Sequence, residues 1–197
     1  MTNLTQQMQF LQELEKLKAV YRQTTVKADN DRPENSAEHS WHIALVAQTL
    51  RPYAGAQVSI ERVIQMLLIH DIVEVDAGDT FAFATDVDMA AQSAQELLAA
   101  QRIFGLLPAA QGQPLLALWQ EFEQAQSADA CFAKAMDRIL PLLQNMANNG
   151  GSWARHRVSK TQVLQRNRHL QRSAPALWQY VGEQVELAVS NGWLVND

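Results

Sequence analysis

Hydrophobic positions recur every three or four residues along most of the chain, which is the period of an amphipathic helix. In the first such stretch, residues 4 to 20, the apolar positions are Leu4, Met8, Leu11, Leu14, Leu17 and Val20. No stretch alternates convincingly with the period of two that is typical of a half-buried strand. The pattern therefore predicts helices throughout.

Short polar breaks separate the helical stretches. Residues 24 to 34 are polar and include Pro33, which predicts a loop. Asn35 or Ser36 can cap the next helix, with Glu38 placed to complete a capping box, and Pro52 marks its end. Further helices are predicted at 60–75, 86–105, 114–124, 128–147, 159–168 and 175–190, with breaks at Pro108, Gly112, Pro114, Gly150 and Gly151. The expected fold is an all-α, single-domain bundle of about seven or eight helices.

Composition narrows the class of protein. A chain of 197 residues with 47% hydrophobic residues can bury one sizeable core, so residues 1–197 are expected to form one domain. The net charge of −5 gives no basic field for a nucleic acid polymer. Cys131 is the only cysteine, which favours a reducing compartment. The chain has neither a secretory start nor a stretch of about 18 apolar residues that could span a membrane, so a cytoplasmic protein is expected.

Polar residues interrupt an apolar helical pattern in "LLIHDIVEVDAGD", residues 67 to 79. Burying an unpaired carboxylate such as that of Asp71 costs several kcal/mol or more. A divalent cation offsets this cost, because it binds a neutral imidazole such as that of His70 together with carboxylate oxygens. The alternative is that these residues are satisfied packing residues of the core.

Two further polar residues lie within apolar helical patterns and could contribute to the same centre. His39 lies in "SAEHSWH", and Asp137 lies in "CFAKAMDRILPLL". With His70 and Asp71 they would provide two nitrogen and two carboxylate ligands, a set that suits several divalent metals. Pro141 removes the helical partner of the Asp137 carbonyl, so a kink that directs Asp137 toward the site is expected. Read singly, His39 would more often be a packing residue and Asp137 a surface residue.

Together these strings resemble a known family. A histidine in "AEHS", then "HD" about thirty residues later, then a single downstream aspartate is similar to the HD-domain superfamily of metal-dependent phosphohydrolases. The strings "RQTTV", "RPENSAEHSWH", "HDIVEVDAGD", "FAKAMDRILPLLQN" and "GGSW" more specifically resemble its bacterial 5'-deoxynucleotidase-like branch. The resemblance runs from about residue 15 to 190.

The resemblance implies roles for individual residues. The four metal ligands of the family correspond to His39, His70, Asp71 and Asp137. Glu74 and Asp79 match acidic residues that handle the attacking water and the substrate, and Arg22 matches an arginine that contacts the phosphate. The family enzymes are helical, commonly dimeric, and use one divalent metal ion such as cobalt, manganese or magnesium; iron, nickel and zinc also suit such ligands. The best-understood members have Trp after this arginine, where this chain has Gln23.

The leading functional hypothesis is a phosphomonoesterase that releases phosphate from nucleoside 5'-monophosphates. One alternative is a hydrolase of another phosphorylated nucleotide, a phosphodiester or a signalling nucleotide, although the extra histidines of a binuclear site are missing. The other is a non-catalytic nucleotide-binding module. The roles of two histidines are left undecided. His42 could join the site, support it by a hydrogen bond or pack, and His156 could line the cleft, lie at a dimer contact or lie on the surface.

Overall fold

The computed structural model describes residues 2 to 83 and 86 to 197, and in this part of the chain it contains eleven α-helices and two β-strands. The helices are α1 Asn3–Leu14, α2 Ser36–Thr49, α3 Ile60–Ile69, α4 Glu74–Ala77, α5 Asp86–Phe104, α6 Ala109–Gln124, α7 Ala128–Ala147, α8 Gly151–His156, α9 Lys160–Asn167, α10 Leu170–Ser173 and α11 Pro175–Ser190. The strands are β1 Tyr21–Val26 and β2 Arg32–Asn35. The predicted all-α class is confirmed, with more helices than expected.

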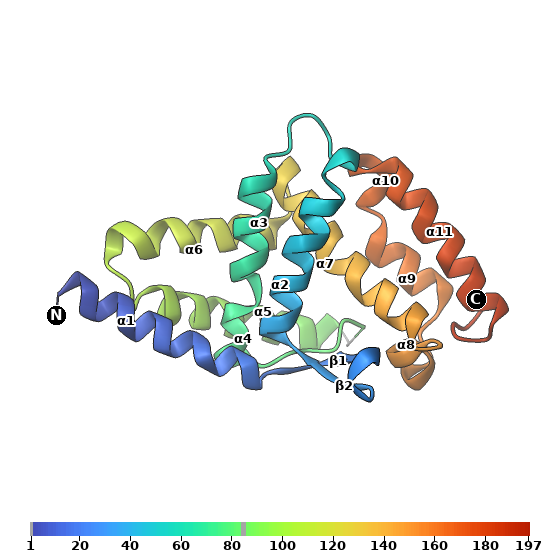
Figure 1. The fold of residues 1–197 in the computed structure, drawn as a ribbon, viewed down its shortest axis with the longest axis horizontal. Helices are drawn as coiled ribbons and strands as arrows, with labels where there is room; N and C mark the ends of the chain where they lie inside the picture. The colour runs from blue at the N-terminus through green and yellow to red at the C-terminus, as the bar shows by residue number, and fades with distance from the viewer. Residues whose placement is uncertain (1, 84–85) are drawn as a thin grey trace.

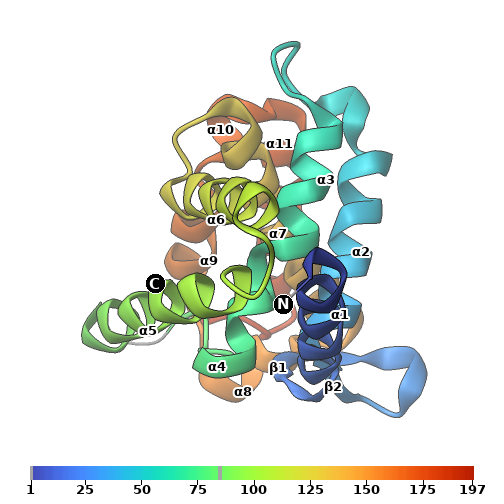
Figure 2. The same cartoon turned by 90° about the vertical axis from the view of Figure 1, so that its left-hand side faces the viewer.

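The helices form one bundle around α2, α3 and α7, which contact one another at its centre (Figure 1). Helices α1, α5 and α6 extend from one side of this centre, and α9, α10 and α11 pack on the other side. The strands project from the end of the bundle below α2 in both views (Figures 1 and 2). Every helix among the described residues is too short or too polar to cross a bilayer.

Two hydrophobic clusters meet near the segment that follows α3. The larger includes Ile43, Met66 and Phe132, and the smaller includes Ile72 and Phe104. The chain passes from one cluster to the other through the 3₁₀ turn His70–Val73. His70 and Asp71 of this turn thus lie between two hydrophobic clusters, where an unpaired charge is destabilising.

The expected loop at residues 24 to 34 is wrong, because β1 and β2 form an antiparallel hairpin there. Thr25 lies opposite Pro33, and Val26 lies opposite Arg32. The turn uses Asn30 and Asp31 with positive φ angles of 51° and 57°. A hairpin of only two strands at the end of a helical bundle needs no regular apolar face, so the sequence lacks the alternation of a strand. Pro33 is tolerated because each strand has a free edge.

Several helix boundaries also differ from those predicted. Helix α1 ends at Leu14, and residues 60 to 75 divide into α3, a 3₁₀ turn and the start of α4. Helix α6 begins at Ala109 and runs through the expected breaks Gly112 and Pro114. A Cβ at Gly112 would lie 2.2 Å from the carbonyl oxygen of Phe104, so this glycine permits close packing. The short helices α8 and α10 were not predicted.

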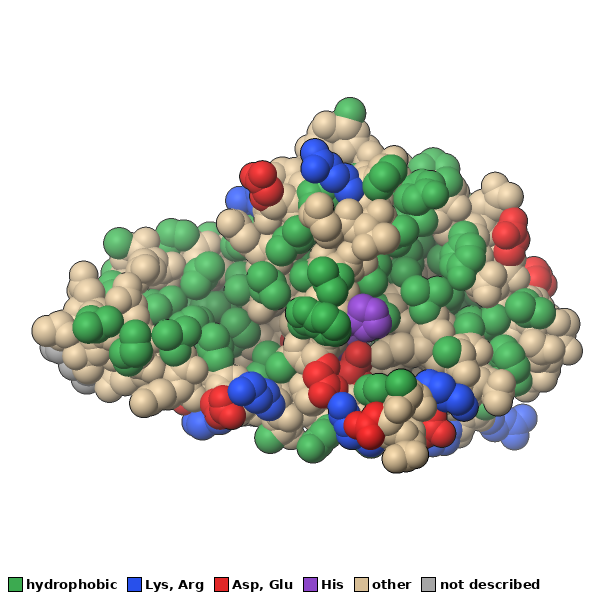
Figure 3. Space-filling view, in the orientation of Figure 1, with side chains coloured by type: hydrophobic (Ala, Val, Ile, Leu, Met, Phe, Trp, Pro, Cys, Tyr) green, Lys and Arg blue, Asp and Glu red, His purple; other side chains and the backbone are tan. Residues whose placement is uncertain are grey.

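The expected cap at the start of α2 is confirmed. The Asn35 side chain accepts a hydrogen bond from the Glu38 backbone N–H at 2.9 Å, and Glu38 accepts one from the Asn35 N–H. Arg32 reinforces this end by pairing with the Glu38 carboxylate. Figure 3 shows acidic and basic side chains beside one another along this lower edge of the molecule. The capping box fixes the start of the helix that carries His39.

Candidate active site

The His70 imidazole presents one nitrogen to two carboxylates. Its Nδ1 lies 2.9 Å from the Leu67 carbonyl oxygen and can donate a hydrogen bond to it, which leaves Nε2 to face the site. Nε2 is buried and lies 2.9 Å from Asp71 Oδ1 and 3.6 Å from Asp137 Oδ1, without the geometry of a regular hydrogen bond to either. Burial lowers the pKa of His70, but the carboxylates of Asp71 and Asp137 outweigh it and raise the pKa to about 10. The site therefore favours a positive charge at Nε2.

His39, on α2, approaches the same Asp137 carboxylate as His70. The residue is fully buried, and its Nε2 lies 2.9 Å from Asp137 Oδ1. The two imidazole rings lie 5.7 Å apart, centroid to centroid. One ligand atom each from His39, His70 and Asp137 lies within 4.8 Å of the others, and Asp71 adjoins this group through its contact with His70. These two nitrogens and two carboxylates fit a divalent metal ion.

Glu34 on β2 is a site residue that the sequence analysis missed. It is 2% exposed, and its Oε2 lies 3.2 Å from His39 Nδ1. Its other oxygen accepts a hydrogen bond from Gln144 Nε2 at 2.7 Å. Burial raises the pKa of Glu34, but the hydrogen bond and charge of His39 outweigh it and lower that pKa. A carboxylate behind a ligand histidine fixes the tautomer and the ring orientation.

Arg22 on β1 lies among four carboxylates. Its Nη1 donates to Asp71 Oδ2 at 2.8 Å and lies 4.0 Å from Glu74 Oε1 and 3.9 Å from Asp79 Oδ1. Its Nε lies 3.8 Å from Glu34 Oε2. Burial lowers the pKa of Arg22, but the surrounding carboxylates outweigh it and raise that pKa, so the guanidinium stays charged. The hairpin thus places a permanent cation beside the predicted metal ligands.

Glu74 and Asp79 line the cleft beside Arg22. The Ser36 hydroxyl donates to Glu74 Oε2 at 2.5 Å, and burial together with the charge of Asp71 raises the pKa of Glu74 well above its usual value. Burial likewise raises the pKa of Asp79 to about 6, although Arg22 opposes the shift. Gly78, with a φ of +74°, permits the turn that brings Asp79 to the cleft. Both carboxyls are suited to carrying a proton near neutral pH.

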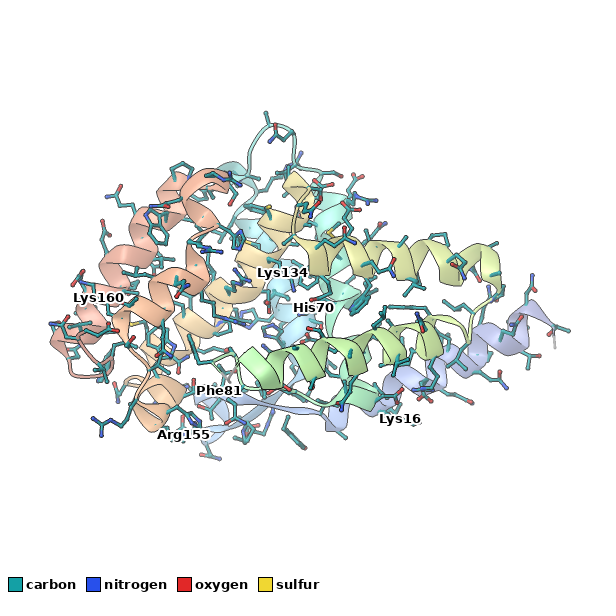
Figure 4. The ribbon with its side chains drawn as sticks, turned by 180° about the vertical axis from the view of Figure 1, so that it is seen from behind. Lys16, His70, Phe81, Lys134, Arg155 and Lys160 are labelled. Carbon is teal, nitrogen blue, oxygen red and sulfur yellow. The ribbon has the colours of Figure 1, made fainter. Side chains whose placement is uncertain are left out.

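Most of these groups line one cleft. Its lining residues include Arg22, His70, Asp71, Glu74, Asp79 and Asp137 together with Phe81 and Phe83, whereas the buried His39 and Glu34 are not among them. In Figure 4 the labelled His70 and Lys134 lie in the middle of the molecule, and Lys134 belongs to the same lining.

Neither His42 nor His156 is among the residues that line the cleft. The exposed His42 stacks beside Trp41 and not in the cleft, at a centroid distance of 5.8 Å. The exposed His156 stacks on the cleft residue Phe81 at 4.3 Å. Helix α7 continues through Pro141, and the kink expected there stays a prediction.

The similarities to known proteins agree with this geometry. A protein-family model described as HD domain matches residues 14–178. The human protein named 5'-deoxynucleotidase HDDC2 is 31% identical over 137 residues, covering 70% of this chain and 65% of the human protein. The chain therefore aligns with slightly less than two thirds of that relative. The 5'-deoxynucleotidase YfbR of Salmonella newport is 29% identical over 183 residues, covering 83% of this chain and 87% of that protein.

Solved structures are similar as well. The crystal structure of a predicted metal-dependent phosphohydrolase from Magnetospirillum magnetotacticum is 45% identical, with a TM-score of 0.90, and the match covers 98% of this chain and 96% of that one. The PH0347 protein from Pyrococcus horikoshii is 18% identical with a TM-score of 0.62, over 90% of this chain and 99% of that one. The second likeness concerns the fold alone.

Proposed function

The chain belongs to the HD domain family, and from this premise we propose that it is a divalent-metal-dependent phosphohydrolase that releases phosphate from nucleoside 5'-monophosphates. The observation that carries the proposal is the buried cluster in which one ligand atom each from His39, His70 and Asp137 lies within 4.8 Å of the others, with Asp71 beside His70. In this proposal His39, His70, Asp71 and Asp137 hold one metal ion.

When bound, the ion would supply Lewis acidity and would favour the ionisation of water near neutral pH. The residues of the chain supply binding and proton transfer. The guanidinium of Arg22 binds phosphoryl oxygens through charge-assisted hydrogen bonds. These replace part of the hydrogen bonding between Arg22 Nη1 and Asp71 Oδ2. Glu74 Oε1, on the side of the carboxyl away from Ser36, carries the proton that the leaving oxygen needs. Asp79 orients the attacking water or the leaving hydroxyl.

Gln23 is the residue of this chain that we assign to the sugar. It follows Arg22 directly and lines the cleft. Its neutral amide can donate a hydrogen bond to a 2'-hydroxyl or lie beside a 2'-methylene. We therefore expect phosphate release from both ribonucleotides and deoxyribonucleotides.

We also propose a homodimer. Trp41 and Leu45 lie one turn apart on α2 and are 61% and 48% exposed, so they form part of an apolar surface that a second copy can cover. The single free thiol of Cys131 supports a cytoplasmic location. Sedimentation velocity of the wild type and of Trp41→Glu tests the dimer, since the substitution is expected to give monomers.

The function is tested by metal analysis followed by phosphate release from a panel of nucleoside 5'-monophosphates. Asp71→Asn is expected to lose bound metal and at least a hundredfold in kcat/KM, as an electrostatic centre of this kind requires. The matched control is Asp76→Asn, which removes the same charge from a residue that pairs outside the cleft with Arg102. Release unchanged in Asp71→Asn would contradict the mechanism. Metal binding without release of phosphate from any nucleotide would favour the non-catalytic module.

A further inference from the structure

Two arginines of the cleft have no role in the reaction described above. Arg138 on α7 and Arg166 on α9 both line it. Arg22 lies among four carboxylates, whereas no ion pair joins Arg138 or Arg166 to a carboxylate in the part of the chain that the structure describes. Asp137 attracts both guanidiniums, Glu123 also attracts Arg138 and Asp79 also attracts Arg166, in each case from beyond ion-pair distance. The cleft thus has one neutralised arginine and two that are not neutralised.

Hydrogen bonds to backbone carbonyls hold both guanidiniums at the wall of the cleft. Arg138 Nη1 donates to the Arg166 carbonyl oxygen at 2.6 Å, and its Nε is buried without a partner among the described residues. Arg166 Nη1 donates to the Ala82 carbonyl oxygen at 3.1 Å, and its guanidinium carbon lies 5.8 Å from the centre of the Phe83 ring. These contacts fix the position of each guanidinium and leave its charge unpaired.

Such an arrangement is costly without a ligand. Both side chains are half-buried in the wall of the cleft, and no described carboxylate forms an ion pair with either guanidinium. A neutral glutamine could donate to either carbonyl, so the carbonyl contacts alone do not require arginine. Paired guanidiniums suit a phosphate group, which accepts bidentate hydrogen bonds and neutralises both charges.

We propose that Arg138 and Arg166 form a second anion subsite in this cleft, which binds a second phosphate group of the substrate, distinct from the phosphate that is released. The inference rests on the proposed function and extends its substrate class from nucleoside 5'-monophosphates to nucleotides with a second phosphate group, either at a separate position of the sugar or as a 5'-diphosphate. Asn167 supports this placement, because it follows Arg166 directly and lines the same cleft, and its buried Oδ1 lacks a partner among the described residues. That oxygen can accept a hydrogen bond from a sugar hydroxyl or a base N–H.

The test compares kcat/KM for adenosine 5'-monophosphate, adenosine 3',5'-bisphosphate, adenosine 5'-diphosphate and p-nitrophenyl phosphate. The wild type is expected to favour at least one of the two-phosphate nucleotides over the monophosphate by about tenfold or more, chiefly through KM. Arg138→Gln and Arg166→Gln should each remove most of this preference, so that kcat/KM falls about tenfold more on the two-phosphate nucleotide than on p-nitrophenyl phosphate. Arg168→Gln is the control, since Arg168 is exposed and does not line the cleft.

The remaining measurements separate the possible failures. Arg138→Lys keeps the charge and should keep part of the preference, and melting temperatures show whether each variant folds. Calorimetric titration of the metal-stripped protein with adenosine 5'-monophosphate and with adenosine 3',5'-bisphosphate measures binding affinity without turnover. The second anion subsite can therefore be tested even if the protein does not release phosphate from nucleotides. The subsite is overturned if the wild type neither prefers nor binds more tightly any nucleotide with two phosphates, or if folded Arg138→Gln and Arg166→Gln keep the full preference.

Discussion

Glu34 Oε2 lies 3.2 Å from His39 Nδ1, so a carboxylate on the hairpin orients a histidine on α2 whose other nitrogen faces Asp137. This links the small sheet to the predicted metal centre. The hairpin also carries Arg22, which pairs with Asp71. It therefore supplies both an orienting anion and the cation of the site.

Glu34→Gln is predicted to weaken metal binding by about tenfold or more, because the neutral amide makes the His39 imidazole a poorer ligand. Competition with a metal chelator measures the change. Glu38→Gln is the control, since this carboxylate caps α2 and pairs with Arg32 outside the cleft. Equal metal affinity in Glu34→Gln and the wild type would show that Glu34 has no orienting role.

Arg22→Gln is predicted to lower kcat/KM for nucleoside monophosphates by about 10²- to 10³-fold, the usual cost of removing a charged group that stabilises the transition state. Arg22→Lys should recover only part of the loss, because an ammonium cannot make the bidentate contact. The same control used for the subsite, Arg168→Gln, should retain full activity. Wild-type activity in Arg22→Gln would exclude Arg22 from phosphate binding.

The metal ligands could be predicted from the sequence because their signal is local. An imidazole or carboxylate within an apolar helical pattern stands out in a window of a few residues, as His70 and Asp71 do. The structure brings these two together with His39 and Asp137 from three separate helical segments, and their binding of a metal stays a prediction. Glu34 gave no such signal, since "RPEN" is polar throughout and its burial depends on a hairpin without an apolar face.

The arginine pair could not be predicted for a related reason. Arg138 and Arg166 are 28 positions apart, and each alone has the spacing of an ordinary exposed helical residue. Only the packing of α9 against α7 brings them together. Gly112 was read as a helix break, although the glycine instead allows α6 to approach the end of α5.

Gly112→Ala is predicted to lower the free energy of unfolding by about 1 to 3 kcal/mol, because its Cβ would overlap the Phe104 carbonyl oxygen and backbone must move. Gly182→Ala is the matched control. Gly182 lies within α11 with no atom within 4 Å of an added Cβ, so alanine there should raise stability by about 0.5 to 1 kcal/mol. Urea unfolding of both variants measures whether the free energy of unfolding falls in Gly112→Ala and rises in Gly182→Ala. Stabilisation by Gly112→Ala would contradict the packing role of Gly112.

Asp79 is predicted to make the metal-free protein less stable as the pH rises. Its pKa in the folded protein is about 6, against 3.8 ordinarily, because burial disfavours the charged carboxylate. The folded state thus retains a proton that the unfolded chain releases, and this stabilisation is complete below pH 3.8 and lost as the pH rises through 6. The shift corresponds to at most about 3 kcal/mol.

Asp79→Asn isolates this contribution, because asparagine resembles the neutral carboxyl at every pH. In EDTA, the variant and the wild type should have similar free energies of unfolding at pH 4, and the variant should be the more stable by pH 7. Urea unfolding across this range measures the difference, with Asp76→Asn as the control for loss of an exposed carboxylate. A difference that is independent of pH, or a wild type that gains on the variant as the pH rises, would show that the Asp79 carboxyl is not destabilised by burial. Added divalent metal should reduce the difference, since its charge favours the ionised carboxylate.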